Sequence, residues 1–223
     1  MEMRKLISAT AAAISAVAIL ATLGALAQQP AKVDQAGAGR AAARPDPAII
    51  DKYVAATFKG ASVEWLKRIE QDETQKVCSQ YRNELPTALF TEVLVREKAA
   101  VVLPADGNVL GDWKAGERVA QTGTGGQFSD GPATATGGNC YACHQLRPTE
   151  LSFGTMGPSL LEYGKIRKYA ADDAKAAYAK IYNAQSTMPC SNMPRFGHAK
   201  FLTEQQIRDL VALLFDPESP VNK

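Results

Sequence analysis

The most constraining feature of this sequence is the stretch GGNCYACHQL at residues 137–146. It places Cys140 and Cys143 two residues apart and puts His144 directly after the second cysteine. The whole chain has only four cysteines and two histidines. Because half of the cysteines and one of the histidines stand together here, the stretch indicates a site that uses sulfur and imidazole in one tight group.

Three chemistries compete for this group. A thioredoxin-like redox motif also has two cysteines at this spacing, but it stands beside a βαβ pattern, which the sequence lacks. A zinc site needs four ligands, and the remaining candidates, Cys78, Cys190 and His198, are scattered along the chain. The third chemistry is c-type haem attachment, in which each cysteine forms a thioether with a haem vinyl group and the histidine becomes an axial ligand. We favour one covalently bound haem c.

A second axial ligand is expected from the loop that precedes the C-terminal helix. This loop offers Met188, Met193 and His198. We prefer Met193, because the turn in MPRFG can aim its sulfur at the iron, while Met188, His198 and an open sixth position stay as alternatives. Histidine–methionine ligation favours a raised reduction potential and pure electron transfer.

Pro158 follows His144 by 14 residues (158 − 144). Its carbonyl oxygen is expected to accept a hydrogen bond from the imidazole ring, which would fix the tautomer of the axial ligand. The alternative is that GPSL is only a turn before a helix.

Two cysteines, Cys78 and Cys190, remain outside the motif. In an oxidising compartment leftover cysteines tend to pair, so we expect a disulfide between them, with two free thiols as the alternative. Closing so long a loop stabilises the fold by about 4 to 5 kcal/mol in the chain-entropy model.

The N-terminus has the pattern of a secretory signal peptide. Arg4 and Lys5 precede an apolar run that ends in ALA at residue 27, as at a signal-peptidase site. We expect a signal peptide over residues 1–27, a flexible leader over 28–46 and a mature protein in the periplasm, free of the membrane. The alternative is an uncleaved anchor, since the run is nearly long enough to span a bilayer.

The rest of the chain predicts an all-α protein, because no segment alternates as a strand does. A helical extension is expected over residues 47–102 and the main domain over 103–223. Helices are expected from Pro47, from a Ser62 cap onward to Val77, after Pro86, near Lys114, over residues 171–184 and after Thr203, where Gln206 completes a capping box.

Composition excludes one class of partner. The net charge is +2, and charged residues make up 22% of the chain. Nucleic-acid-binding domains usually carry a concentrated basic face, so nucleic acid is not expected as the main partner. The basic residues Lys165, Arg167 and Lys168 are either a docking patch or an ordinary solvated face.

Several stretches together resemble SoxX, the monohaem cytochrome subunit of the SoxAX complex of bacterial thiosulfate oxidation. The resemblance covers residues 103–216 and is carried by the following stretches: LGDWKAGERVAQTGTGGQFSD, GGNCYACHQL, MGPSLLEYG, IYNAQ and MPRFGH with LTEQQIRDLVALL.

The resemblance implies a class I cytochrome c fold, with Cys140 and Cys143 as the haem attachments, His144 as the proximal ligand and Met193 as the distal ligand. It also implies an electron-transfer subunit of a heterodimeric L-cysteine S-thiosulfotransferase. The partner would be a SoxA-type subunit with one or two haems, which holds the bond-forming site, so that this chain supplies no catalytic residue.

In that complex, thiosulfate is joined to a cysteine of the SoxYZ carrier, and the electrons pass to a soluble cytochrome. Met188 and Cys190 depart from the family pattern. Two other functions stay open at this point: a free-standing periplasmic electron carrier, and a haem-based sensor with an open sixth position.

Overall fold

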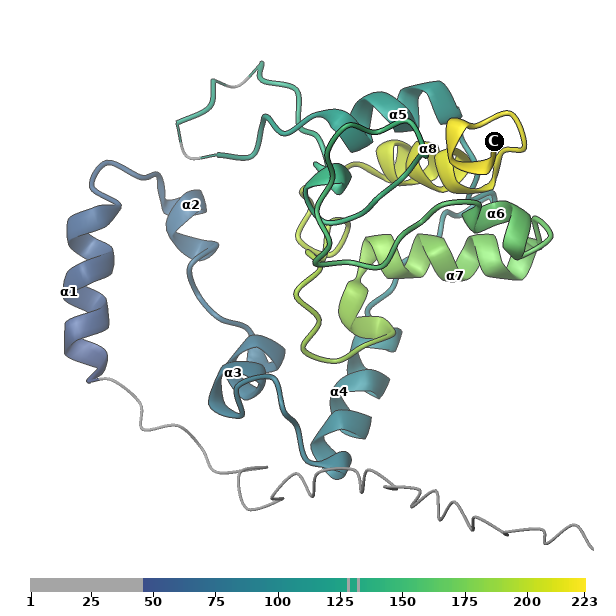
Figure 1. The fold of residues 1–223 in the computed structure, drawn as a ribbon. Coiled ribbons are helices and arrows are strands. Elements are labelled where there is room, and N and C mark those ends of the chain that lie inside the picture. The colour runs from purple at the N-terminus through teal and green to yellow at the C-terminus, as the bar shows by residue number, and fades with distance from the viewer. Residues whose placement is uncertain (1–45, 128, 132) are drawn as a thin grey trace, which may run out of the picture. The chain divides into compact units, whose positions relative to one another are not determined.

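The computed structural model describes residues 46–127, 129–131 and 133–223. Helices and loops make up these residues, with no strand among them, which confirms the predicted all-α fold (Figure 1). The expected signal peptide and nearly all of the expected leader lie outside the described residues. Within the described part of the chain, no helix is both long enough and apolar enough to cross a bilayer.

From residue 46 onward, where the described part of the chain begins, four helices precede the main domain. They are α1 (Pro47–Thr57), α2 (Val63–Lys67), α3 (Glu73–Gln80) and α4 (Thr87–Ala99). Ser62 caps α2 as predicted, its hydroxyl accepting from the Trp65 backbone N–H.

The single helix expected from Ser62 to Val77 is wrong, because the chain forms two helices there. Asp72 starts α3 with a capping box, in which its carboxylate accepts from the Gln75 backbone and the Gln75 side chain accepts from the Asp72 backbone. Such a box satisfies two backbone donors at a helix start. It therefore begins a new helix where the apolar spacing alone suggested continuation.

The main domain contains the other four helices: α5 (Trp113–Gln121), α6 (Tyr163–Ile166), α7 (Ala171–Tyr182) and α8 (Glu204–Phe215). The predicted capping box of Thr203 and Gln206 begins α8. Ile207 and Val211 on α8 are fully buried, so this helix runs through the centre of the core.

Helices α5 and α8 cross closely (Figure 1). Gly116 makes the approach possible, because a Cβ atom built on it would lie 2.0 Å from the backbone oxygen of Asp209. The buried Asp209 carboxylate accepts from the Asp112 backbone N–H at 2.9 Å and from the Gln205 side chain at 2.8 Å. The crossing is thus fixed by backbone contact and by paired polar groups.

The main hydrophobic core draws its buried members from residues between Val109 and Val221. The helical extension adds none of them, and several of its apolar side chains, such as Ile49, Tyr53 and Val63, are exposed. The extension is attached instead through α4, which packs against a short 3-10 turn, η3 (Ala184–Ser186), that follows α7. The proposed boundary between residues 102 and 103 stays a prediction.

Candidate haem-binding site

The motif cysteines lie on one tight turn. The 3-10 turn η2 (Cys140–Ala142) follows Asn139, whose φ of 47° is left-handed. The backbone N–H groups of Cys143 and His144 both donate to the Cys140 carbonyl, at 3.1 and 2.9 Å. Because both bonds converge on one oxygen, the two thiols and the imidazole start from the same turn of backbone.

This turn is tied to the end of α5. The Gly138 backbone N–H donates to the Val119 carbonyl at 2.8 Å, and the Asn139 N–H donates to the Thr122 carbonyl at 3.0 Å. Since α5 is itself packed against α8, the motif is connected through α5 to the core helix.

His144 has one ring nitrogen engaged by the protein. Its Nδ1 lies 2.7 Å from the carbonyl oxygen of Pro158, so the structure brings together the two residues that the sequence spacing paired. A carbonyl oxygen only accepts hydrogen bonds, so Nδ1 carries the hydrogen and the neutral ring has its lone pair on Nε2. That is the tautomer a metal ligand needs.

Gly157 makes room for this ring. A Cβ atom at residue 157 would lie 2.2 Å from Cε1 of His144. The Gly157 backbone N–H also donates to the Cys143 carbonyl at 2.8 Å. The segment after the motif therefore packs directly under the imidazole, and only a residue without a side chain fits there.

The thiol chemistry argues against a redox dithiol. Cys140 and Cys143 are both free cysteines. Burial raises the pKa of the Cys140 thiol to about 12. Reactive cysteines of disulfide oxidoreductases have a lowered pKa, because the thiolate is the attacking species. Cys140, which is partly buried against the core, has a raised pKa instead.

The additional ligands that a zinc site at this motif would need are not available. Cys78 and Cys190 are bonded to each other, and His198 is exposed. Across the described ranges, no group of three or more histidine, cysteine, aspartate or glutamate side chains is placed to hold a metal ion. The residues that are present therefore fit a haem, which brings its own four nitrogen ligands to the iron.

The three candidates for the sixth position differ in burial. Met193 is half-buried and packs against the hydrophobic core, as Cys140 does. Met188 is 53% exposed, and His198 is also exposed. A half-buried side chain on the core is better placed for an apolar cofactor than an exposed one, so the structure favours Met193; its role as a ligand stays a prediction.

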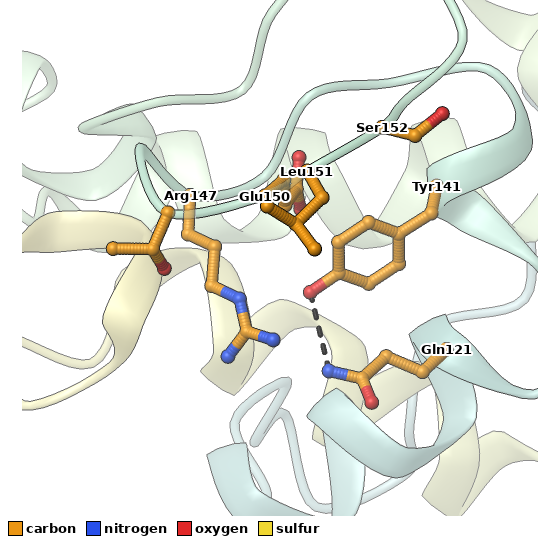
Figure 2. Close-up of a pocket in the computed structure, with 7 residues that line it drawn as sticks. Gln121, Tyr141, Arg147, Glu150, Leu151 and Ser152 are labelled. Carbon is orange, nitrogen blue, oxygen red and sulfur yellow. Dashed lines mark hydrogen bonds between the residues drawn. The ribbon is translucent and has the colours of Figure 1, made fainter.

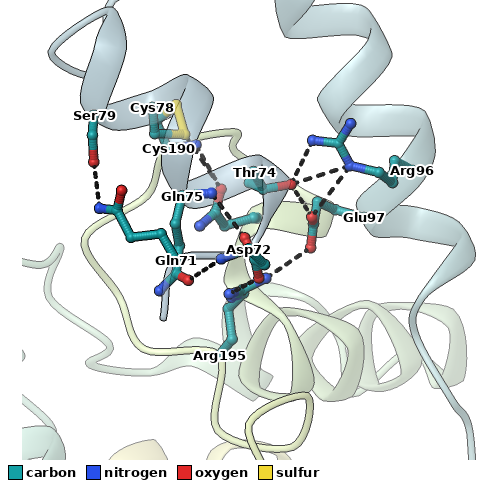
Figure 3. Close-up of a disulfide and its surroundings, with 11 residues drawn as sticks. Gln71, Asp72, Thr74, Gln75, Cys78, Ser79, Arg96, Glu97, Cys190 and Arg195 are labelled. Carbon is teal, nitrogen blue, oxygen red and sulfur yellow. Dashed lines mark hydrogen bonds and ion pairs between the residues drawn. A yellow bond between two sulfur atoms is a disulfide. The ribbon is translucent and has the colours of Figure 1, made fainter. Parts of the chain in front are cut away.

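The expected disulfide between Cys78 and Cys190 is present, with Cα atoms 5.4 Å apart (Figure 3). It joins α3 of the extension to the loop between α7 and α8. Both cysteines are buried. The covalent link therefore connects the extension to the loop that carries Met193.

Sequence reasoning missed a buried ionic cluster beside this disulfide. Glu97 on α4 accepts from the Asn183 side chain at 2.8 Å and from the Thr74 hydroxyl. Arg195 lies 3.4 Å from the Glu97 carboxylate and also pairs with Asp72. The one available signal was Glu97 itself, which stands four residues after the buried Val93 and thus on the inward face of α4.

The partners of Glu97 decide its charge state. Burial alone would raise the pKa of Glu97, but hydrogen bonds from Thr74 and Asn183 and the charge of Arg195 hold that pKa below its usual value. The pKa of Asp72 is lowered as well: burial opposes the shift, while the Gln75 backbone and Arg195 outweigh it. Both carboxyl groups are therefore ionised at neutral pH.

A hollow of about 500 Å³ lies beside the haem motif (Figure 2). The phenol of Tyr141, which stands between the motif cysteines, reaches toward the Gln121 side chain at 3.3 Å. Arg147 forms another part of the wall, and its guanidinium pairs with Glu117 at 2.8 Å. Because Glu117 already compensates the charge of Arg147, we propose no charged ligand for this hollow.

Comparisons with known proteins identify a family for the part of the chain that contains the motif. A family model described as "Cytochrome c" matches residues 128–215, which include the motif, Pro158 and Met193. The chain is also similar to an uncharacterized lipoprotein of Aquifex aeolicus (strain VF5), with 42% identity over 155 residues. That match spans 69% of this chain and 73% of the Aquifex protein.

Proposed function

Because the chain belongs to the cytochrome c family, we propose that it is an exported electron-transfer protein with one haem c. Cys140 and Cys143 would hold this haem covalently, and His144 and Met193 would bind its iron. When bound, the haem supplies one-electron redox chemistry.

One observation carries the proposal. His144 donates through Nδ1 to the Pro158 carbonyl at 2.7 Å, in the C-x-x-C-H turn that attaches c-type haem. This bond orients the ring and selects the tautomer. The fold therefore holds His144 in the orientation and the tautomer that an axial ligand needs.

We further propose that the electron-transfer partner is a SoxA-type cytochrome. The chain would then be the electron-transfer subunit of a SoxAX-type L-cysteine S-thiosulfotransferase. The reaction joins the terminal sulfur of thiosulfate to a cysteine thiol of the SoxYZ carrier, with loss of one proton and two electrons. The electrons would leave one at a time through this subunit to a soluble cytochrome acceptor.

Two features support this finer proposal. The stretches that resemble SoxX run through the whole domain from residue 103 to residue 216, well beyond the haem motif. The chain also has the helical extension, whose apolar side chains Ile49, Tyr53 and Val63 are exposed. A free-standing electron carrier does not need such an extension. The bond-forming site would lie on the partner, because Met193 would close the open face of the iron.

The test is capture of the affinity-tagged, full-length protein from the periplasm of thiosulfate-grown cells. The expected result is co-purification of a second haem protein in equal amount, with thiosulfate-dependent reduction of a cytochrome when the pair is supplied with the SoxYZ carrier. The same purification from cells grown without thiosulfate is the control. Recovery of this chain alone, fully loaded with haem, would favour the free-standing carrier.

We place the mature protein in the periplasm after cleavage behind Ala27. The similar Aquifex protein is named a lipoprotein. For this chain the proposal is supported by the signal-peptide pattern of its N-terminus. Release of the haem protein by osmotic shock is expected; retention in washed membranes would contradict it.

A further inference from the structure

The loop between α7 and α8, residues 183–203, carries the proposed ligand Met193 but has little regular structure of its own. Its only helical element in the structure is the short turn η3. A loop of this kind moves unless other parts of the protein hold it. Phe196 and Leu202 anchor the loop by burying their side chains in the main core. Two further attachments join the loop to the extension, and they stand on either side of Met193.

The first attachment is covalent and lies three residues before Met193. Cys190 is bonded to Cys78 of α3, and its backbone N–H donates to the Gln185 side chain at 3.0 Å. Cys190 also has a left-handed φ of 59°. A non-glycine residue keeps such a conformation only where its surroundings over-determine it, and here the disulfide and Gln185 do so.

The second attachment is ionic and lies two residues after Met193. The Arg195 side chain, 11% exposed, reaches Glu97, whose side chain is 5% exposed. It also reaches Asp72, at the start of α3 (Figure 3). A buried charge without its partner is strongly unfavourable. Glu97 has Arg96 as a second cationic partner, at 3.9 Å, and displacement of the loop would leave it with that partner alone. The loop position that places Arg195 between the two carboxylates is therefore preferred.

We propose that α3 and α4 form a clamp on the loop, in which Arg195, Glu97 and the disulfide are positioning elements that keep the Met193 sulfur at the iron. This inference rests on the proposed Met193 ligation. It gives the extension a function within this chain: the extension adds nothing to the main core, yet it fixes the residues on both sides of the sixth ligand.

The clamp predicts a change at the iron when the ionic attachment is broken. Arg195→Gln removes the charge that both carboxylates face. In the purified haem-loaded variant, the ferric sulfur-to-iron charge-transfer band is expected to weaken, and carbon monoxide is expected to bind the ferrous form at least about tenfold faster, as loss of a charge-assisted hydrogen bond allows. Arg195→Lys, which restores the charge, should recover part of both signals.

A matched control separates this effect from general loss of charge. Glu162→Gln removes an exposed ion pair with Lys165 on α6, away from the loop in sequence and not bonded to it. This variant should keep the full band and the carbon monoxide rate of the unaltered protein.

The covalent attachment is tested on protein that has already folded, so that failure to fold plays no part. The disulfide of the haem-loaded protein is reduced, the two thiols are alkylated, and the iron is re-oxidised with ferricyanide. A sample treated with alkylating agent but not with reductant is the control. The clamp predicts a weaker charge-transfer band and faster carbon monoxide binding only in the reduced and alkylated sample.

Met193→Ala is the reference that separates the two proposals. If this variant keeps the band, Met193 is not the ligand and the proposed ligation fails. If it loses the band while both Arg195→Gln and the alkylated protein keep the full band and the unaltered rate, Met193 is the ligand and the clamp is overturned.

Discussion

At the scale of single residues, the two loop methionines give the sharpest contrast. Met188 and Met193 each precede a proline, but Met188 is 53% exposed and Met193 packs on the core. Met193→Ala is expected to abolish the sulfur-to-iron charge-transfer band and open the iron to carbon monoxide. Met188→Ala should leave both unchanged and alter the free energy of unfolding by no more than about 0.5 kcal/mol.

Absorption spectroscopy of the oxidised proteins and carbon monoxide titration of the reduced proteins check this prediction. The opposite pattern, with the band lost only in Met188→Ala, would transfer the ligand role to the exposed methionine.

Gly157 gives a second prediction at this scale. In Gly157→Ala the new methyl group would lie 2.2 Å from the His144 ring, so the ring must turn and weaken its bond to Pro158. We expect a loss of stability of about 1–3 kcal/mol, as for other overpacked sites, and a lower yield of haem-loaded protein. Thermal unfolding and the ratio of haem to protein measure the two effects.

Gly131→Ala is the matched control for this substitution. Among the described residues, a Cβ atom at residue 131 meets the Thr134 hydroxyl alone, at 3.9 Å, which is an ordinary contact. Equal losses in both variants would mean that the space beneath the imidazole has no special role.

The contacts of the site residues were not equally predictable from the sequence. The pairing of His144 with Pro158 was predictable, because a short spacing behind a specific motif limits what the chain can do. The pairing of Glu97 with Arg195 was not, since the two residues are far apart in sequence and a charged residue in a helix is usually at its surface. Only the packing of α4 on η3 brings them together.

At the scale of elements, helix starts were more predictable than helix extents. The sequence predicts the capping box of Thr203 and Gln206, which begins α8. The equivalent box of Asp72 and Gln75, which begins α3, is not among the predictions. Apolar spacing from Ser62 to Val77 was continuous enough to suggest one helix. The local polar signal at Asp72 outweighs that spacing, because two backbone donors are satisfied there at once.

The crossing of α5 and α8 provides a prediction at this scale. Gly116→Ala would place a methyl group 2.0 Å from the Asp209 backbone oxygen, and two helix backbones have no flexible side chain to move aside. Although alanine favours helix more than glycine does, we expect a net destabilisation of about 1–3 kcal/mol from overpacking.

Chemical denaturation of the haem-loaded proteins measures this change. Lys114→Ala, an exposed substitution on the same helix, is the control and should lie within about 0.5 kcal/mol of the unaltered protein. A Gly116→Ala variant that is more stable than the unaltered protein would show that helix propensity outweighs the close approach.

At the scale of the whole molecule, the attachment of the extension should depend on pH. The pKa values of Glu97 and Asp72 are lowered in the folded protein. A lowered folded pKa stabilises the fold above the unfolded pKa, and this stabilisation is lost as pH falls through the folded value. We therefore expect stability contributed by these groups to be intact at neutral pH and to fall in acid, below the ordinary glutamate pKa of 4.5.

Thermal unfolding of the protein and of Glu97→Gln, compared from neutral pH into acid, checks this dependence. The variant cannot ionise at residue 97, so the difference in unfolding temperature between the two proteins should be largest near neutral pH and should shrink in acid. A difference that stays constant over this range would mean that ionisation of Glu97 does not stabilise the fold.

The haem motif and the helix signals were sufficient to predict the fold class of the domain, because covalent attachment and capping are both local properties of the chain. The connection between extension and loop depends on contacts between distant residues. The disulfide was the one such contact that could be expected, since it followed from counting cysteines and from the expectation of an oxidising compartment.

That disulfide has a consequence for how the protein matures. The haem motif lies between Cys78 and Cys190, so one pair of cysteines must cross-link while the enclosed pair stays reduced until it reacts with vinyl carbons. Four cysteines allow three pairings into two disulfides, and every one of them uses up the motif thiols. Cells that oxidise secreted thiols but supply no haem should therefore accumulate scrambled chains, and timing of the two chemistries decides the yield.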